Sequence, residues 1–427
     1  MHLKAFLLTA LDSATSGGRR YHLWMGTLTV IMLVGGYAYI VQATNGLTVT
    51  GMNDHVSWGL YISNMAFLVG VAAAAVILVM PAYVLHDVDF SRAVLIAEGV
   101  AVAALVMCLG FVTANSPGFP WKWWRLAPVI GKLNWPSSML AWDVIALNGY
   151  LLLNLAIPFY ILFSHFTGRE PAKKRYVPFI YLSVVWAVSI HLITAFLFAA
   201  PPSRPLWNSP LLGPRFLASA FTAGPAFMIL LLGFIRSTTK YAISDVAISK
   251  LATATTIAAQ INLVMLLSDL VFEFYFPTHH SISARYLFFG IGEHNTLVPW
   301  IRSAIVLNVV ATVALTFHPV RRSARLLMPA CATLFVAIWV EKGIGLVIPG
   351  FIPSPLGEIV EYTPTWVEVA VTAGIWALGL FVLTVLVRVA LPIELGQVRS
   401  PYLESPPTDR ATRPRPRHPE MRPIRTR

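Results

Sequence analysis

The chain has 427 residues, of which 57% are hydrophobic and 12% are charged, and its formal net charge is +12. Soluble proteins carry about 25% charged residues, and the uncharged apolar runs of this chain are long enough to cross a bilayer. The composition therefore excludes an ordinary soluble protein and predicts a polytopic helical membrane protein.

Ten apolar segments, each about 20 residues or longer, follow one another along the chain, and this is the length that a membrane-spanning helix needs. They cover residues 22–43, 57–84, 93–115, 139–164, 177–200, 212–235, 247–275, 297–318, 326–349 and 366–391. We therefore expect an all-α integral membrane protein, a bundle of about ten transmembrane helices.

Three regions are expected along the chain. Residues 1–20 form an N-terminal segment without an apolar core that ends in a small-residue cleavage site, so we expect no cleavable signal. Residues 21–395 form one membrane domain. Residues 396–427 are rich in Pro and Arg with few apolar residues, which predicts a disordered basic tail.

The basic residues predict an orientation rather than a nucleic-acid partner. The N-terminus and one set of connections hold fourteen Lys and Arg residues, whereas the opposite set holds seven. By the positive-inside rule the richer side faces the cytoplasm, which places both termini there. Because the charge is spread over short connections and a tail that can meet anionic lipid, we expect no nucleic-acid binding.

Cysteine and histidine are too sparse for a metal cofactor in this chain. Cys108 and Cys331 both lie inside apolar runs, so no cysteine cluster is available for an iron–sulfur centre. Haem b needs two histidines at matched depth on facing helices, and the one candidate partner for His191 is His55, at the mouth of a helix. We therefore expect neither haem nor an iron–sulfur cluster, and no metal site.

Three connections on the predicted outer side are unusual in composition. Residues 117–125 hold three tryptophans beside two cations, and residues 278–281 and 290–294 together hold three histidines. An interfacial aromatic belt explains the tryptophans, and a docking surface for an extracytoplasmic partner is the functional alternative. The Gly-Ile-Gly at 290–292 lacks the strand, the third glycine and the following helix of a dinucleotide fingerprint.

The stretch from Gly51 to Asn64 opens the second span with a concentration of polar and aromatic groups. His55, Trp58, Tyr61 and Asn64 follow one another at the mouth of an apolar helix. Trp and Tyr offer flat apolar walls together with N–H and O–H donors. This stretch therefore predicts one side of a binding site.

Ionisable residues recur at a similar depth in several other spans, where they are costly and therefore functional candidates. His191 lies 16 residues beyond Arg175, about 24 Å from the cytoplasmic end of its helix. Glu341 likewise lies 16 residues beyond Arg325. Other ionisable residues fall near this level or begin their helices at the outer surface: Asp269, Lys342, Asp143 and Glu368.

Such a layer suits a quinone, which presents two carbonyls, a flat ring and two protons per turnover. Histidine and carboxyl groups can hydrogen-bond the carbonyls and relay protons. The predicted quinone-binding residues are His55, Trp58, Tyr61, Asn64, Asp143, His191, Asp269 and Glu368. A proton path toward the opposite face is predicted to use Glu98, Gln260, Asn262, Glu341 and Lys342.

Structural alternatives stand beside each assignment. Asp143 and Glu368 lie near helix N-termini, where a carboxylate complements the helix dipole. Glu341 and Lys342 could pair with neighbouring charges, asparagines in spans often join helices, and His191 could be a satisfied bundle histidine. A secondary transporter is the alternative of a different class, but we find no convincing inverted repeat of the kind that transporters carry.

Four segments resemble the polysulfide reductase NrfD family, and they recur in the family's order: residues 51–62, 139–151, 214–221 and 353–368. The resemblance covers about residues 45–395 and is strongest to the ten-span branch of DsrP and HybB, with DsrP the better match. After the third span the chain reads Ala-Asn-Ser-Pro-Gly-Phe-Pro at 114–120, where many members have an Asp-Leu-Gly-Arg-Pro-like segment.

The resemblance implies a haem-free subunit of an oxidoreductase complex rather than a complete enzyme. Such a subunit exchanges electrons between menaquinone and a periplasmic ferredoxin-like iron–sulfur subunit, DsrO-like in the DsrMKJOP complex of dissimilatory sulfur metabolism. The other implied partners are cytochrome b, cytochrome c and heterodisulfide-reductase-like subunits, in the cytoplasmic membrane of a bacterium or archaeon. By motif, the resemblance assigns the quinone site to His55, Trp58, Tyr61, Asp143 and Glu368.

Overall fold

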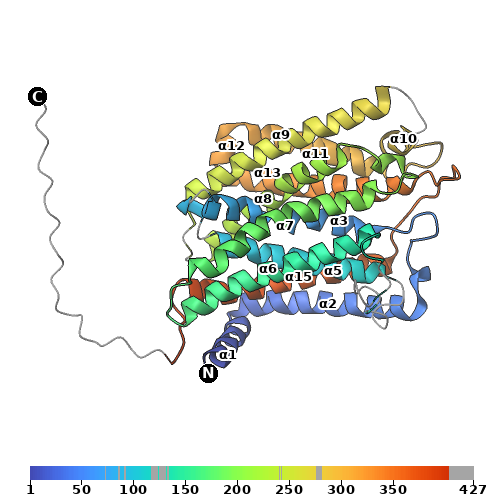
Figure 1. The fold of residues 1–427 in the computed structure, drawn as a ribbon. Helices are drawn as coiled ribbons and strands as arrows, with labels where there is room; N and C mark the ends of the chain where they lie inside the picture. Colours follow the sequence, from blue (N-terminus) through green and yellow to red (C-terminus); the bar gives the residue numbers. More distant parts are fainter. Residues whose placement is uncertain are drawn as a thin grey trace, which may run out of the picture.

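The computed structural model of the chain describes residues 1–72, 74–84, 87–90, 93–116, 124, 131, 134–239, 241, 243–275 and 281–402. Within these residues, ten helices are long and apolar enough to cross a membrane (Figure 1). The predicted all-α bundle is therefore confirmed. The tryptophan-rich segment 117–125, apart from residue 124, lies outside the described residues, as do residues 278–280 and 403–427.

The helix order follows the ten predicted apolar segments. The spans are α2 (Arg19–Asn45), α3 with α4 (Leu60–Ala72 and Ala74–Val79), α5 (Val94–Asn115), α6 (Met139–Phe166), α7 (Lys173–Ala199), α8 (Leu212–Thr238), α9 (Asp245–Tyr275), α11 (Val298–Thr316), α13 (Ala324–Ile338) and α15 (Trp366–Glu394). Short helices are α1 (His2–Thr15), α10 (Ser281–Phe289), α12 (His318–Arg322) and α14 (Gly345–Val347), with 3-10 turns η1 (Leu47–Val49), η3 (Val88–Phe90), η5 (Pro205–Trp207) and η7 (Pro349–Phe351).

Two spans contain a π-helical turn. The span that begins with α3 and α4 ends in η2 (Met80–Val84), and α13 continues into η6 (Trp339–Ile344). A π turn inserts an extra residue into the helical repeat and often marks a functional position. Here η6 carries Glu341 and Lys342, both buried.

Successive spans run in opposite directions, so the connections gather at two ends of the bundle (Figure 1). The loop end holds residues 46–59, 200–211, 290–297 and 352–365. The terminal end holds α1 and the last described residues, where His2 Nδ1 lies 2.9 Å from Ser400 Oγ. Both ends of the described chain thus lie on the same side of the bundle.

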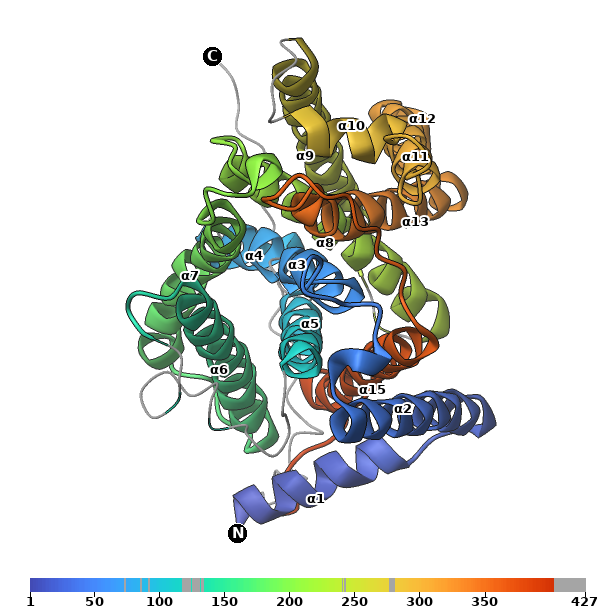
Figure 2. The ribbon, with the colours of Figure 1, turned by 90° about the vertical axis from the view of Figure 1, so that its right-hand side faces the viewer.

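The most buried helices, α3 and α5, lie at the centre of the bundle, with α6 and α7 on one side of α5 and α2 and α15 on the other (Figure 2). The helix α2 lies at the periphery and packs along α15. Gly35 and Gly374 make this contact possible, because a Cβ on Gly35 would meet Gly374 Cα at 2.6 Å. Small residues bring transmembrane helices together in this way.

Candidate functional site

The loop before α3 turns the side chain of His55 toward the surface. Asn53 Oδ1 accepts hydrogen bonds from the N–H groups of His55 and Val56, at 2.9 Å each, so the turn is held by its own side chain. His55 Nε2 lies 3.6 Å from Glu358 Oε2, and the two side chains are 38% and 59% exposed. His55 is therefore a surface residue of the loop end and does not reach the buried groups described below.

Trp58 belongs to an aromatic cluster beneath the loops. Its ring stacks on Trp207 with 5.9 Å between centroids, and it meets Phe198 and Phe351 edge to face. Trp207 Nε1–H donates to the carbonyl of Leu346 at 2.8 Å. The cluster joins the beginning of α3 to the end of α7 and to η5 and η7. These ring contacts hold the segments of the loop end against one another.

Glu368 has the geometry of a helix cap. Thr365 and Glu368 form a capping box at the start of α15, in which Glu368 Oε2 accepts from Thr365 N–H at 3.0 Å. The same oxygen accepts from Gly51 N–H at 2.6 Å, and Oε1 accepts from the Tyr362 hydroxyl at 2.5 Å. Both carboxylate oxygens thus accept hydrogen bonds within the chain. This arrangement fits the structural alternative, in which Glu368 stabilises the N-terminus of its helix.

The polar atoms of Tyr61 and Asn64 also form hydrogen bonds within the chain. The Tyr61 hydroxyl donates to Gln42 Oε1 at 2.6 Å. Asn64 Oδ1 accepts from the indole N–H groups of Trp339 and Trp376, at 3.0 and 2.9 Å. These bonds tie α3 to α2, α15 and η6.

Asp143 differs from these residues because part of its carboxyl group has no partner. The N-cap of α6 is Ser138, so Asp143, the fifth residue of the helix, does not cap it. Its side chain is fully buried, and Oδ1 accepts from the Thr194 hydroxyl at 2.6 Å. Among the described residues, nothing hydrogen-bonds Oδ2.

His191 lies one turn before Thr194 on α7 and is also fully buried. Its Nδ1 lies 2.7 Å from the carbonyl of Ala187. A carbonyl only accepts, so Nδ1 carries the hydrogen and neutral His191 presents an unprotonated Nε2. The backbone of Val69 on α3 also lies against the imidazole, but Nε2 has no hydrogen bond of ordinary geometry in the described part of the chain. His191 and Thr194 are three residues apart and share a face of α7, and Thr194 bonds Asp143. These three residues are called here the Asp143 cluster.

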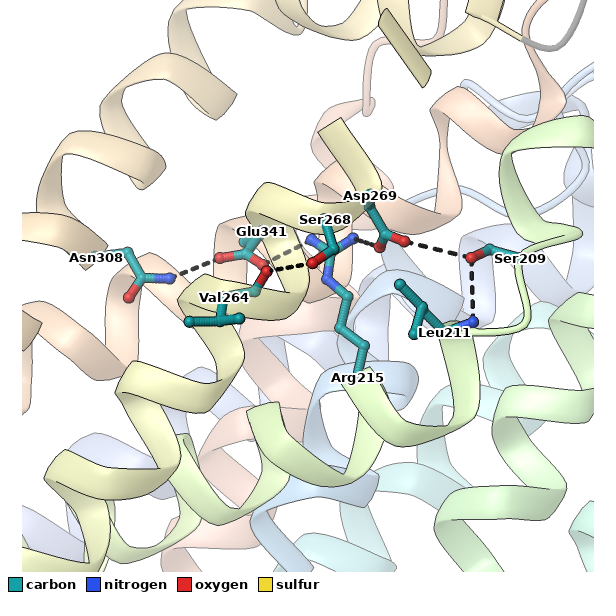
Figure 3. A network of polar contacts seen from close by, with 8 residues as sticks. All are labelled: Ser209, Leu211, Arg215, Val264, Ser268, Asp269, Asn308 and Glu341. Atoms are coloured by element: carbon teal, nitrogen blue, oxygen red, sulfur yellow. Dashed lines mark hydrogen bonds and ion pairs between the residues drawn. The ribbon is translucent and has the colours of Figure 1, made fainter. Parts of the chain in front are cut away.

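A second polar group, partly buried, lies between α8, α9, α11 and η6 (Figure 3). Arg215 Nη1 donates to Asp269 Oδ2 at 2.7 Å, and Nη2 donates to Glu341 Oε1 at 2.8 Å. Asn308 Nδ2 donates to Glu341 Oε2 at 2.7 Å, and the Ser209 hydroxyl donates to Asp269 Oδ1 at 3.3 Å. These five residues, the Arg215 network, satisfy both carboxylates.

Arg215 is one of the seven Lys and Arg residues that the sequence assigns to the connections of the outer side, and for this residue the prediction was wrong. Arg215 is the fourth residue of α8 and its side chain is 20% exposed. Pro214 stands directly before it in the sequence, and a charged residue beside a proline is typical of the end of a connection. A lone arginine within reach of two acids at matched depth was the signal that could have identified the network.

The predicted proton-path residues fall into separate places. Gln260 Nε2 donates to Thr316 Oγ1 at 2.9 Å, and the Thr316 hydroxyl donates to the backbone carbonyl of Thr312 at 2.8 Å. The Thr312 hydroxyl donates to Asn308 Oδ1 of the Arg215 network at 3.3 Å. Glu341 belongs to the Arg215 network itself. Asn262 is buried with no partner for its amide among the described residues, and Glu98 is buried in α5. Lys342 is also buried, and its Nζ donates to the carbonyl of Phe216 at 3.2 Å.

Fold and site together define a polytopic helical membrane protein with ionisable groups inside its bundle. The chain belongs to the polysulphide reductase NrfD family, whose family model matches residues 48–353. The family resemblance read from the sequence is thereby confirmed.

Three relatives carry names that indicate their assemblies. A Halobacterium salinarum protein, provisionally named as a membrane subunit of dimethyl sulfoxide reductase, is 25% identical over 417 residues, covering 89% of this chain and 93% of that protein. A selenate reductase subunit of Mesobacillus selenatarsenatis is 22% identical over 410 residues, covering 86% and 93%. The Hdr-like menaquinol oxidoreductase integral membrane subunit of Archaeoglobus fulgidus is 24% identical over 213 residues, 50% of each chain.

Proposed function

We propose that this chain is the quinone-interacting membrane subunit of a multi-subunit oxidoreductase. It exchanges electrons between a menaquinol-type quinol in the bilayer and an iron–sulfur subunit outside the membrane. The names of the three relatives support a subunit of a redox complex, and one of them names menaquinol. The observation that carries the proposal is the Asp143 cluster, where two fully buried polar atoms have no partner among the described residues.

Those two atoms have the chemistry that a quinone ring needs. A bound quinol supplies two electrons and two protons when it is oxidised, and a quinone takes up the same number when it is reduced. Asp143 Oδ2 can accept a hydrogen bond from one ring hydroxyl and take its proton, while the Thr194 hydroxyl holds Oδ1. His191 Nε2 can accept from a second hydroxyl, because Nδ1 is engaged with Ala187.

The other predicted quinone contacts take supporting roles in this proposal. Tyr61, Asn64 and Glu368 hold the loop end of α3 against its neighbours through bonds within the chain. Trp58 belongs to the aromatic cluster, and His55 lies on the surface, where a partner subunit would dock.

Proton movement is assigned to the Arg215 network. Side-chain hydrogen bonds lead from Glu341 to Asn308 and Thr312. One turn further along α11, toward the terminal end of the bundle, Thr316 accepts from Gln260. Hydroxyl and amide groups in a row can order the water that carries protons. Glu98 and Asn262 lie outside this row and extend it only through water.

The orientation and the complex follow from the sequence. The richer set of basic residues puts the terminal end in the cytoplasm of a bacterial or archaeal cell, and the loop end faces a DsrO-like iron–sulfur subunit. The motif resemblance favours a DsrP-type complex of sulfur metabolism with cytochrome and heterodisulfide-reductase-like subunits. The alternative is a HybB-like subunit of a hydrogenase or of another molybdenum or iron–sulfur reductase. The subunits that co-purify with the chain distinguish the two.

Asp143→Asn tests the proposal directly. The amide still accepts from Thr194 but cannot take up a proton, so quinol-dependent reduction of the iron–sulfur partner in membranes should fall about 100-fold or more. Asp245→Asn is the control, because this acid pairs with Arg236 in an exposed position at the terminal end. Near-normal rates in an assembled Asp143→Asn complex would mean that the cluster is structural.

A further inference from the structure

The N-terminal helix α1 lies outside the membrane-spanning bundle. It is found at the terminal end, joined to α2 by residues 16–18, and it runs across the bundle axis rather than along it (Figure 1, Figure 2). Its 14 residues make a helix about 21 Å long, too short to cross a bilayer. This orientation places α1 parallel to the membrane plane, at the level where the spans leave the hydrocarbon region.

One side of α1 is held by the bundle. The Phe6 ring is buried and meets three phenylalanine rings of α6 edge to face. They are Phe159, Phe163 and Phe166, at 5.5, 5.7 and 5.4 Å between centroids. These contacts fix the rotation of α1 about its own axis, so the side opposite Phe6 is turned away from the bundle.

The outward side of α1 carries a stripe of leucines. Leu3, Leu7 and Leu11 are spaced four residues apart and therefore lie along one face, and they are 51%, 56% and 61% exposed. Leu8, beside the stripe, is 57% exposed. Apolar area in contact with water is unfavourable, and a contiguous exposed patch of this kind marks an interaction surface.

The position of the stripe indicates that lipid covers it. The next helix, α2, lies at the periphery of the bundle (Figure 2), and its exposed apolar residues begin with Leu23 and Trp24, at 62% and 44%. Tryptophan near the end of a span is typical of the membrane interface. The leucine stripe thus lies directly before a surface that faces lipid.

The charges near the stripe fit a lipid surface as well. Residues 1–20 contain Lys4, Arg19 and Arg20 but a single acid, Asp12, and all four side chains are exposed. Basic residues beside an apolar face complement anionic lipid headgroups, and the combination is typical of helices that lie in the membrane interface.

We propose that α1 is an interfacial helix that binds the surface of the bilayer, with Leu3, Leu7 and Leu11 among the outer parts of the acyl chains. Because Phe6 packs against α6, this anchor also holds the terminal end of the helix that carries Asp143. The proposal concerns a lipid surface and does not rest on the proposed function.

Spin labelling of the full-length chain in lipid nanodiscs tests the proposal. Cys108 and Cys331 are fully buried, so a nitroxide can be attached selectively at Leu7→Cys. Oxygen, which concentrates among acyl chains, should relax this label more strongly than a water-soluble nickel chelate. The ratio of the two effects, calibrated with lipids labelled at known depths, should place the nitroxide about 5–10 Å inside the headgroup boundary.

Asp12→Cys is the matched control, because it lies on the same helix and about 140° around it from Leu7. The nickel chelate should relax the Asp12 label more strongly than oxygen does. Leu11→Cys gives a second reading on the stripe and should agree with Leu7→Cys.

Three results would overturn the proposal. Stronger relaxation by the nickel chelate at Leu7 and Leu11 would mean that α1 lies in water. A label at Leu7 that neither reagent reaches would mean that protein, from a second copy or a partner subunit, covers the stripe. Oxygen dominance at Asp12 as well would contradict the orientation. Each result would leave the proposed function standing, because that function is tested separately by Asp143→Asn.

Discussion

The Asp143 cluster and the Arg215 network place carboxylates in opposite situations within one bundle. In the Arg215 network, one guanidinium bonds two carboxylates, and Asn308 and Ser209 occupy the remaining oxygens. In the Asp143 cluster the carboxyl group has a single hydroxyl partner and forms no ion pair within the described residues.

This difference indicates which group stabilises the bundle and which group is suited to proton transfer. A buried ion pair with its hydrogen bonds complete resists change, because removing either partner strands a charge at low dielectric. A buried carboxyl group without a cation exchanges a proton with less disturbance to its surroundings. The network therefore holds α8, α9, α11 and η6 together, and the cluster is the better reaction centre.

Among the substitutions considered, Arg215→Ala should lower the free energy of unfolding most, because it removes the ion pairs of the Arg215 network. Asp269 and Glu341 would lose their shared cation inside the bundle, which costs about 3–5 kcal/mol in the free energy of unfolding. The apparent Tm of the purified protein in detergent measures this loss. Arg236→Ala is the control, because its exposed pair with Asp245 is worth at most about 1 kcal/mol. Equal Tm values for the two variants would contradict the importance of the network.

Replacing a carboxylate by its amide on each side sharpens the comparison. Glu341→Gln loses a charge-assisted bond from Arg215, so the free energy of unfolding should fall by about 1.5–3 kcal/mol. Asp143→Asn loses no ion pair and should change it by less than about 1 kcal/mol while abolishing quinol-linked activity. Thermal unfolding and the membrane assay, run on both variants, measure the two effects. A large stability loss in Asp143→Asn would mean that its carboxylate is paired after all.

Glu361, in the loops, should give the smallest effect and a pH dependence. Burial alone would raise its pKa, but hydrogen bonds from Thr296 N–H and the Tyr286 hydroxyl, with His294 nearby, hold the pKa below the ordinary value of 4.5. A carboxylate with a lowered folded-state pKa stabilises the protein above its unfolded pKa, and that contribution is lost as the pH falls through the folded pKa.

Glu361→Gln should therefore lower stability at pH 7 by less than about 1 kcal/mol, and the difference from wild type should shrink as the pH falls below 4.5 and through the folded-state pKa. Thermal unfolding between pH 3 and 7 measures it. Glu358→Gln serves as the comparison, because Glu358 is exposed and lies 3.6 Å from His55. A wild-type advantage that does not shrink as the pH falls below 4.5 would contradict the assignment.

Some residues of the candidate site could be predicted from the sequence, whereas their hydrogen-bond and ion-pair partners could be identified only in the structure. His191 and Glu341 were predicted from depth and Asp143 also from the family motif, and all three are buried in the bundle. Their partners were not predictable: Thr194 resembles any helix threonine, and Arg215 reads as a loop charge. Glu368 and Asp143 looked alike in sequence, yet one is a cap and the other is not.

The sequence by itself determined that this protein spans a membrane ten times, because the bilayer sets the length of each apolar run and the helical rise sets the depth of each charge. It also identified the family, through segments that recur in order. Only the tertiary structure decided which faces of the helices meet. Rotation about a helix axis leaves the depth of a residue unchanged but decides whether it meets lipid, a backbone carbonyl or a counter-charge. That rotation paired Arg215 with two carboxylates and turned His55 to the surface. It also left Asp143 Oδ2 and His191 Nε2 inside the bundle without hydrogen-bond partners among the described residues.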